Sequence, residues 1–276
     1  ANSSVAKDLI KYLSNNNELY LIYRNVTKKK LNKKFQNIKQ YKLNEINKIN
    51  KNKFDLIINC IAIHEFSKEK KLIDYVKSNI VILLDFLNSG IKSKQILNLS
   101  TISKFDLSKK AKITEKNQLS NNSLLAITKA TLDKLLKFQS IPNINLLLPG
   151  IVTSDKKVDR PFLKKIINDI KNKKKIEIFN LHKPFNSFID TLELFKFINY
   201  ILISKKVYNF DEYILCPSGK TTLFNLFKYY ENIYNKQIKV IDLGENHNHY
   251  LLSNSKLKRK FEFYPSNVKA ILKRLV

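Results

Sequence analysis

Two hydroxyl residues and one lysine near the middle of the chain are the side chains best suited to carry chemistry. Ser100 and Thr101 end the apolar segment Gln95-Ile-Leu-Asn-Leu-Ser-Thr, and Lys129 lies in a helical pattern over 123–138. A hydroxyl at a strand end, followed by an inward-facing lysine on the next helix, can bind a cofactor ribose or support proton transfer. The same residues also fit a buried strand and a surface lysine, so the pattern alone leaves both interpretations open.

Hydrophobic spacing predicts the elements that must position these residues. A helix over 5–13 follows Ser3 and Ser4, either of which would cap it and leave free N–H groups for an anion. Strands are predicted at 18–24, near 41–46, and at 54–63, 95–101 and 144–150, with helices at 67–88 and 123–138. The run 54–63 is predominantly apolar, as expected for a strand buried on both faces. The alternation predicts an α/β fold, a Rossmann-like doubly wound parallel sheet over residues 1–150.

Residues 151–276 are predicted to form a smaller α/β lobe, because the regular alternation stops near Gly150. Its predicted helices cover 162–171, 191–204, 221–234, 254–261 and 266–275, and its strands cover 175–179, 213–216 and 240–243. We expect this lobe to bind substrate.

The net charge of +28 raises the question of nucleic acid as a partner. Lysines supply nearly all of it, since only four of the 51 basic residues are arginines (Arg24, Arg160, Arg259 and Arg274). Nucleic-acid sites favour arginine, which makes forked contacts with phosphate and guanine. The lysines are spread along the whole chain, so we expect no specific nucleic-acid partner but an attraction for anionic small molecules, nucleotides included.

The chain carries no predicted membrane span or secretory signal. Its most apolar segments, such as 80–84 and 144–148, are far shorter than a bilayer requires, and its first residues are polar. Cys60 and Cys216 lie in apolar surroundings and are predicted to be buried thiols of a reducing compartment. We therefore expect a cytoplasmic protein.

Two motifs are rejected as sites. Gly219-Lys220-Thr221 resembles the end of a phosphate-binding loop, but residue 214 is Ile where that loop needs a glycine, so a turn and a helix cap are predicted instead. Two of the four histidines, His247 and His249, are two residues apart in a polar stretch, without further ligands at metal-site spacing. No metal is expected.

Arg24 follows the predicted strand 18–24 and has two interpretations. In a dinucleotide fold, an arginine at this place accommodates the 2′-phosphate of NADP, whereas an acidic residue binds the ribose hydroxyls of NAD. The alternative is an ordinary surface arginine. The run Lys28-Lys29-Lys30 adds positive charge nearby and favours NADP over NAD.

In order along the chain, the segments resemble the extended short-chain dehydrogenase/reductase family, which comprises NAD(P)-dependent nucleotide-sugar epimerases, dehydratases and reductases. Residues 1–6 are similar to the end of its glycine-rich turn, Leu99-Ser100-Thr101 to its catalytic strand, and Lys129 to the lysine of its Tyr-x-x-x-Lys motif. Further resemblances are found at 55–62, Asn79, 113–115, 147–151, 188–191 and 257–265.

The resemblance implies an NADP(H)-dependent oxidoreductase or epimerase that acts on a nucleotide-linked sugar by hydride transfer. It implies catalytic roles for Thr101 and Lys129, and a homodimer formed through helices 67–88 and 123–138. The residues that it implies at the cofactor are Ser3, Ser4, Val5, Arg24, Cys60, Ile61, Ala62, Ser100, Lys129, Pro149 and Ile151.

Three departures from the family pattern have consequences for function. Leu125 stands where the catalytic tyrosine belongs, so another group (His64 is one candidate) must supply the proton, or the protein is a catalytically silent member that binds a dinucleotide or nucleotide sugar. Ser3 and Ala6 replace the second and third glycines of the turn, and Ser3 would crowd a pyrophosphate. The first strand is absent from the printed sequence. We expect a further segment ahead of Ala1, because removing a central strand would expose a large apolar face.

Overall fold

The computed structural model describes residues 3–23, 37–63, 70–107, 111–154, 162–172, 175–246 and 249–275. The chain divides into two compact units. The first comprises Ala1–Lys104, Asn121–Leu147 and Leu194–Glu212; the second comprises Phe105–Ser120, Leu148–Glu193 and Tyr213–Val276.

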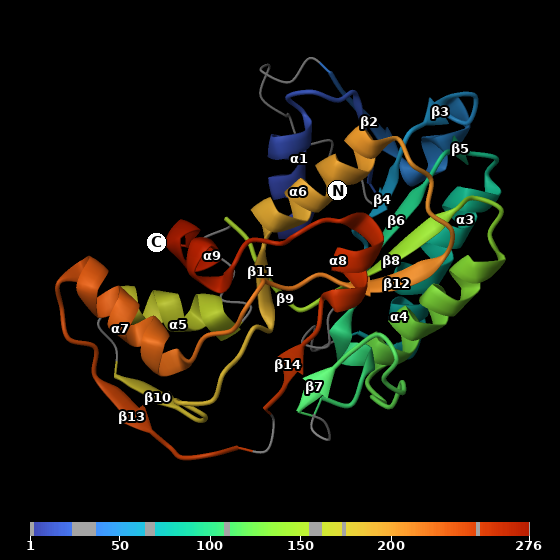
Figure 1. Cartoon of the computed structure of the whole chain (residues 1–276). Coiled ribbons are helices and arrows are strands. Elements are labelled where there is room, and N and C mark those ends of the chain that lie inside the picture. Colours follow the sequence, from blue (N-terminus) through green and yellow to red (C-terminus); the bar gives the residue numbers. More distant parts are fainter. Residues whose placement is uncertain are drawn as a thin grey trace. The chain divides into compact units, whose positions relative to one another are not determined.

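A four-stranded sheet contains the strands nearest to the candidate catalytic residues (Figure 1). Its order is β12 (Asp211–Ile214), β8 (Asn143–Leu148), β6 (Ile96–Thr101) and β4 (Ile57–Asn59). β4 and β6 pair in parallel, with Ile57 opposite Ile96. Every residue of β8 is buried, and only Thr101 of β6 is not. Layers therefore cover both faces of these two strands, which confirms the predicted α/β fold with a parallel sheet.

β4 differs from the predicted strand 54–63 in both length and burial. Phe54 belongs to a separate short strand, β3 (Lys53–Phe54), which pairs with β5 (Lys92–Ser93), and β4 ends at Asn59. Ile57 and Ile58 are only partly buried, because a cavity borders this strand. The prediction of one long strand buried on both faces was therefore wrong.

β1 (Leu19–Tyr23) and β2 (Ile38–Lys42) form a separate parallel two-stranded sheet. The predicted strand near 41–46 thus lies earlier in the chain, and a 3₁₀ helix, η1 (Leu43–Lys48), follows it. The Glu45 carboxylate accepts a hydrogen bond from the Lys42 main-chain N–H (2.8 Å), which starts this helix and ends the strand.

The helices of the first unit lie close to their predicted positions. α1 (Ser4–Leu13) is capped by Ser3 and α4 (Leu124–Leu135) by Ser123, whose hydroxyls accept main-chain N–H groups three residues later. α2 (Leu72–Val76) continues through a π-helical turn, Lys77–Val81, into α3 (Ile82–Asn88). The remaining described elements of this unit are η3 (Ile102–Lys104), η4 (Leu136–Phe138) and most of α6 (Thr191–Ser204).

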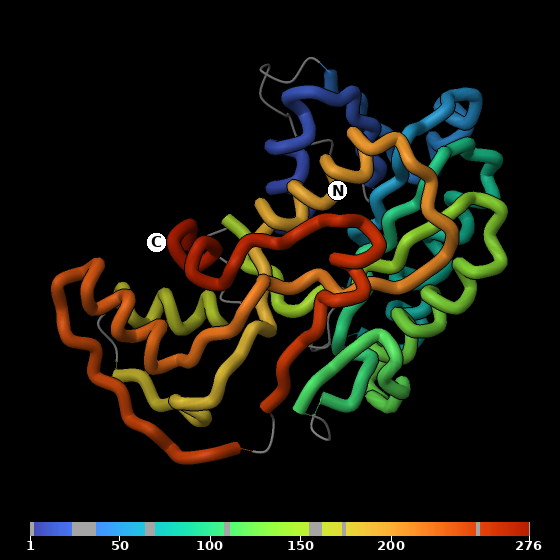
Figure 2. The backbone as a smooth tube through the Cα atoms, viewed as in Figure 1, coloured from blue at the N-terminus to red at the C-terminus, as the bar shows by residue number. Residues whose placement is uncertain are grey.

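The second unit contains three short parallel strand pairs and four helices among its described residues. The pairs are β9 (Gly150–Val152) with β11 (Phe188–Asp190), β10 (Ile176–Ile178) with β13 (Val240–Asp242), and β7 (Lys112–Ile113) with β14 (Leu251–Leu252). The helices are α5 (Phe162–Lys171), α7 (Leu223–Tyr234), α8 (Ser255–Phe261) and α9 (Val268–Arg274), the last three traced in orange and red in Figure 2. α5, α7 and α9 share one apolar core.

The rejected phosphate-loop motif forms the predicted turn, and the residue that follows it caps a helix. Gly219 adopts a left-handed conformation (φ 79°), and the Thr222 hydroxyl caps α7 by accepting the Asn225 N–H (3.1 Å). In the described part of the chain, no helix is long and apolar enough to cross a membrane. Those same residues contain no cluster of three His, Cys, Asp or Glu side chains that could hold a metal.

Candidate functional site

The segment that follows β4 is held in place by three side chains from three different elements. Asn59, the last residue of β4, accepts the Ile61 N–H (3.1 Å). Asn79, in the π-helical turn, accepts the Ile63 N–H (2.8 Å), and Lys129 of α4 donates to the Ile61 carbonyl (2.8 Å). The carboxyl ends of parallel strands are where open α/β sheets bind ligands, so this fixed segment lies where a site is expected.

Lys129 is buried and faces the sheet, which excludes the interpretation of a surface lysine. Only 2% of the residue is exposed, and its ammonium also donates to the Leu99 carbonyl (3.0 Å). Lys129 therefore joins the ends of β4 and β6. Burial lowers the pKa of Lys129 to about 8, an effect that the charge of Asp133 opposes.

The two hydroxyls at the end of β6 have different surroundings. Thr101 is partly buried, and its hydroxyl oxygen accepts the Ser103 N–H (3.0 Å), which leaves the hydroxyl proton able to be donated. Ser100 is buried and donates to the Asp133 carboxylate (2.6 Å). Thr101 is thus the more accessible hydroxyl, and Ser100 takes part in a buried network.

That network crosses three neighbouring strands through asparagine side chains. Asn59 of β4 donates to Asn98 of β6 (2.7 Å), and Asn98 donates to Asn145 of β8 (2.9 Å) and to Asp133 of α4 (2.8 Å). All four residues are at most 3% exposed. Because the bonds join the strands side to side and to α4, they fix the register of the sheet beneath Lys129.

A buried lysine neutralises the acidic end of the network. Lys104 is only 1% exposed. Its Nζ lies 2.9 Å from Oδ2 of Asp133 and 2.7 Å from Oε1 of Glu212, a residue of β12. Burial raises the pKa of Asp133, and the charge of Lys104 counters that rise. The sequence analysis did not identify this buried network. The visible signal for it was an asparagine in each of three otherwise apolar strands.

Leu125 lies one helical turn before Lys129 on α4 and is buried, with 8% of its surface exposed. Its side chain has no group that can exchange a proton. The residue therefore packs as a core residue at the position where the resemblance implies an acid.

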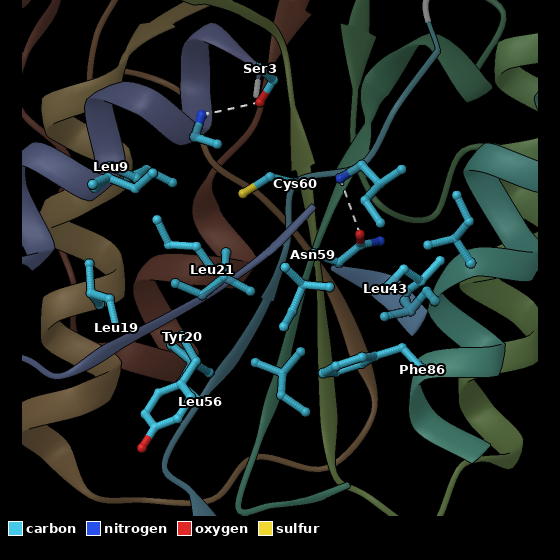
Figure 3. Close-up of a pocket in the computed structure, with 18 of the residues that line it drawn as sticks. Ser3, Leu9, Leu19, Tyr20, Leu21, Leu43, Leu56, Asn59, Cys60 and Phe86 are labelled. Carbon is cyan, nitrogen blue, oxygen red and sulfur yellow. Dashed lines mark hydrogen bonds between the residues drawn. The ribbon is translucent and has the colours of Figure 1, made fainter. Parts of the chain in front are cut away.

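A cavity of about 470 Å³ adjoins the fixed segment (Figure 3). Ser3, Cys60, Ile61 and Ala62 are among the residues that line it, so the structure brings together four of the residues predicted to bind a cofactor. Elsewhere its walls are mostly apolar side chains, among them Leu9, Leu21, Leu56 and Phe86. Burial raises the pKa of the Cys60 thiol to about 11, so this cysteine is not a thiolate at neutral pH.

α1 begins beside this cavity, because its N-cap residue, Ser3, is one of the lining residues. Ser3 is exposed, and its hydroxyl oxygen accepts a hydrogen bond from the Ala6 N–H (3.2 Å). Ser4 and Val5 form the first turn of the helix. The start of a helix offers main-chain N–H groups and a partial positive charge to an anion. The Ser3 side chain stands at that start, as the sequence predicted.

The remaining predicted site residues lie either outside the described residues or in the second unit. Arg24, Lys28–Lys30, His64 and His247 lie outside the described residues. Pro149 and Ile151 belong to the second unit, where Pro149 immediately precedes β9 and Ile151 lies in its middle. The roles assigned to these residues stay predictions.

Solved structures of other proteins share the fold of this chain at low sequence identity. The chain shares its fold with UDP-glucuronic acid 4-epimerase from Bacillus cereus, solved in complex with NAD (16% identity, TM-score 0.78, 98% of this chain and 91% of that one). It is similar to UDP-N-acetylglucosamine 4-epimerase from Methanobrevibacter ruminantium M1 (19%, 0.79, 98% and 92%) and to a putative epimerase from Burkholderia cenocepacia J2315 (13%, 0.80, 99% and 94%). No protein-family model and no curated protein matches the sequence.

Proposed function

We propose that this protein is an NADP(H)-dependent oxidoreductase of the epimerase type that acts on a nucleotide-linked sugar. The observation that carries the proposal is the placement of Lys129, which is buried between the ends of β4 and β6. Its ammonium donates to the carbonyls of Ile61 and Leu99, and Leu99 lies two residues before Thr101. The solved structures with this fold include epimerases of UDP-sugars, one of them crystallised with NAD.

The residues around the cavity suit the phosphate-bearing half of a dinucleotide. Ser3 and the first turn of α1 present N–H groups, and Cys60, Ile61 and Ala62 provide a fixed wall against which a nucleotide can lie. Bound there, a nicotinamide dinucleotide supplies hydride acceptance and hydride return. The preference for NADP rests on Arg24, because a guanidinium at that place pairs with a 2′-phosphate.

The other roles follow from the side chains themselves. The hydroxyl of Thr101 would orient the reacting sugar hydroxyl by hydrogen bonding, and Lys129 would hold the ends of two strands at a constant spacing beside it. Leu125 supplies no proton, so another group must accept the proton of that hydroxyl. His64, which follows the fixed segment in the sequence, is the candidate that the sequence offers.

Hydride transfer can be tested with purified protein and a panel of UDP-sugars. Lys129→Ala and Thr101→Ala should each lower turnover by about 10²-fold or more, the usual loss when a positioned catalytic group is removed. Thr114→Ala, a partly buried hydroxyl of the second unit, serves as the matched control and should leave turnover unchanged. Undiminished turnover in both Lys129→Ala and Thr101→Ala would refute the proposal.

Leu125 favours a second candidate function, a catalytically silent protein that binds a dinucleotide or nucleotide sugar as a sensor or partner subunit. Leu125 is buried in α4, at the position where the resemblance implies an acid. On this account the protein binds NADPH and UDP-sugars but turns over none of them. Turnover well above the uncatalysed background would exclude it.

We propose in addition that the protein is a homodimer paired through α2 and α4. Large apolar side chains on these two helices and on the adjoining η4 are strongly exposed: Leu72 (58%), Ile73 (51%), Ile127 (47%) and Phe138 (85%). Exposed apolar side chains gathered on neighbouring helices are a common basis for association.

A further inference from the structure

Three side-chain donors from the described residues converge on the carboxylate of Asp133. They are the Ser100 hydroxyl (2.6 Å), the Asn98 amide (2.8 Å) and the Lys104 ammonium (2.9 Å). Asp133 is 2% exposed, so these donors stand in for the water that would otherwise solvate it. Because an ionised carboxylate only accepts hydrogen bonds, it can satisfy all three donors at once.

The Asn98 bond starts a chain with a fixed direction. Asn98 donates through its NH₂ group to Asp133, and its oxygen accepts from the NH₂ group of Asn59 (2.7 Å). Asn59 has its oxygen left, and that oxygen accepts the Ile61 N–H (3.1 Å; Figure 3). An asparagine amide has one accepting end and one donating end, so each residue sets the orientation of the next. The direction is therefore set at the carboxylate and passed on to Ile61.

Lys129 closes this chain into a ring. It lies one helical turn before Asp133 on α4 and donates to the Ile61 carbonyl (2.8 Å). Both main-chain groups of Ile61 are thus tied to α4, the carbonyl directly and the N–H through the two asparagines. The same carboxylate also holds Ser100, the residue before Thr101.

We infer that Asp133 is a positioning residue, whose carboxylate sets the direction of this chain and so orients Ile61 and Thr101. The inference rests on the proposed function, in which Ile61 belongs to the wall beside the nucleotide and Thr101 orients the sugar hydroxyl. Asp133 acts on both through its neighbours Asn98 and Ser100.

Asp133→Asn changes the direction of the chain without changing the size of the side chain. One of the two terminal oxygens becomes an NH₂ donor. The Lys104 ammonium, a charged donor, holds the remaining oxygen, so the NH₂ group faces Asn98. Donor then meets donor, and the mismatch passes through Asn59 to the Ile61 N–H.

The double variant Asp133→Asn/Lys104→Met should restore the direction. Without Lys104, the amide can turn its oxygen to Asn98 and its NH₂ group to the Ser100 hydroxyl, which can also accept. A merely structural role for Asp133 predicts no recovery, because the double variant also removes the ion pair of Lys104 with Glu212 (2.7 Å). The comparison of single and double variants therefore separates positioning from stability.

Turnover of UDP-sugars gives the first readout. Asp133→Asn should lower kcat by about 10²-fold, the loss expected when reacting groups are misplaced, with little change in KM because no contact with substrate is removed. The double variant should regain at least about tenfold of that loss. The matched control is Asn143→Ala, which removes a buried bond to the Leu136 carbonyl (2.8 Å) at the start of β8. It should lower stability and leave kcat unchanged.

Hydrogen exchange at the Ile61 amide gives a second readout that needs no turnover. It is expressed relative to the Leu146 amide in the middle of β8, so that a loss of global stability cancels. Asp133→Asn should raise this ratio about tenfold, the effect of about one net hydrogen bond, and the double variant should return it toward the wild-type value. Asn143→Ala should leave the ratio unchanged.

An unchanged ratio in Asp133→Asn, or no recovery in the double variant, would overturn the inference. A raised ratio with unchanged kcat in an active protein would overturn it too, because the orientation of Ile61 would then not matter to the reaction. A wild type that turns over no UDP-sugar would refute the proposed function, and the exchange ratios would still decide whether Asp133 orients Ile61.

Discussion

Two features of Lys129 have opposite effects on the stability of its charged form. Its ammonium donates to two main-chain carbonyls, which favours the charged form, yet the side chain is buried, which disfavours it. Burial is the larger effect and lowers the pKa of Lys129 to about 8 from its ordinary value of 10.5. The lysine that joins β4 to β6 therefore loses its proton more readily than an exposed lysine does.

The first prediction concerns the pH dependence of stability. Below pH 8, Lys129 is protonated in both the folded and unfolded states, and the fold bears the full cost of the buried charge. Between about pH 8 and 10.5 the unfolded state binds more protons, so this residue makes the free energy of unfolding rise with pH, by up to about 3 kcal/mol. Urea unfolding of the wild type and of Lys129→Met across this range measures the difference. Identical pH profiles would contradict the assignment, since all other lysines titrate in both proteins.

The second prediction restores the missing acid. Leu125→Tyr should raise turnover of a UDP-sugar by about 10²-fold or more, because a tyrosine one turn before Lys129 can exchange a proton with the sugar. Leu124→Tyr is the matched control, on the neighbouring position of α4, and should leave turnover at the wild-type rate. No gain in Leu125→Tyr, with the fold retained by circular dichroism, would argue for a binding function.

Among the elements, the sequence predicted β6 and α4 and their order along the chain. It did not predict the side-chain contacts that link α4 to β4 and β6. Apolar spacing located both elements, but it left open whether Lys129 faces the sheet or lies at the surface. It could not show that Lys129 ends on the Ile61 carbonyl, because that contact depends on β4 ending at Asn59 instead of continuing to residue 63. The sequence did not predict the asparagine network for a similar reason. The three asparagines lie far apart along the chain, and only the register of the paired strands brings their side chains together.

The third prediction tests the buried charge network. Lys104→Met should lower the free energy of unfolding by about 3–5 kcal/mol, because it leaves the Asp133 carboxylate buried without a countercharge. Lys134→Met, an exposed lysine next to Asp133 in the sequence, is the matched control and should change stability by less than about 0.5 kcal/mol. Equal effects of the two substitutions in urea unfolding would contradict a structural role for Lys104.

The fourth prediction concerns association through α2 and α4. Sedimentation should show a dimer for the wild type, and a monomer for the double variant Ile127→Lys/Phe138→Lys, because two charges would be buried in the contact. Ile203→Lys, at an apolar residue on α6 that is 70% exposed, should leave the dimer intact. A wild-type monomer at micromolar concentration would refute the homodimer.

For the whole molecule, the sequence predicted the fold class, and the comparisons support it over nearly the full chain. At 12–19% identity the shared fold does not carry the substrate or the cofactor with it. The choice of NADP depends on Arg24, which lies outside the described residues. Pro149 and Ile151 lie in a different unit from the fixed segment after β4, so their cofactor contacts stay a prediction.

The central claim is that this protein binds a nicotinamide dinucleotide, and the ligand retained on purification tests it most directly. Protein purified under mild conditions is denatured, and the released small molecules are identified by mass spectrometry. We predict NADP(H) in the wild type and its loss in Arg24→Asp. NAD(H) in its place would contradict the inference from Arg24. The absence of any dinucleotide, together with no binding of millimolar NADPH or NADH to the folded protein, would contradict the account as a whole.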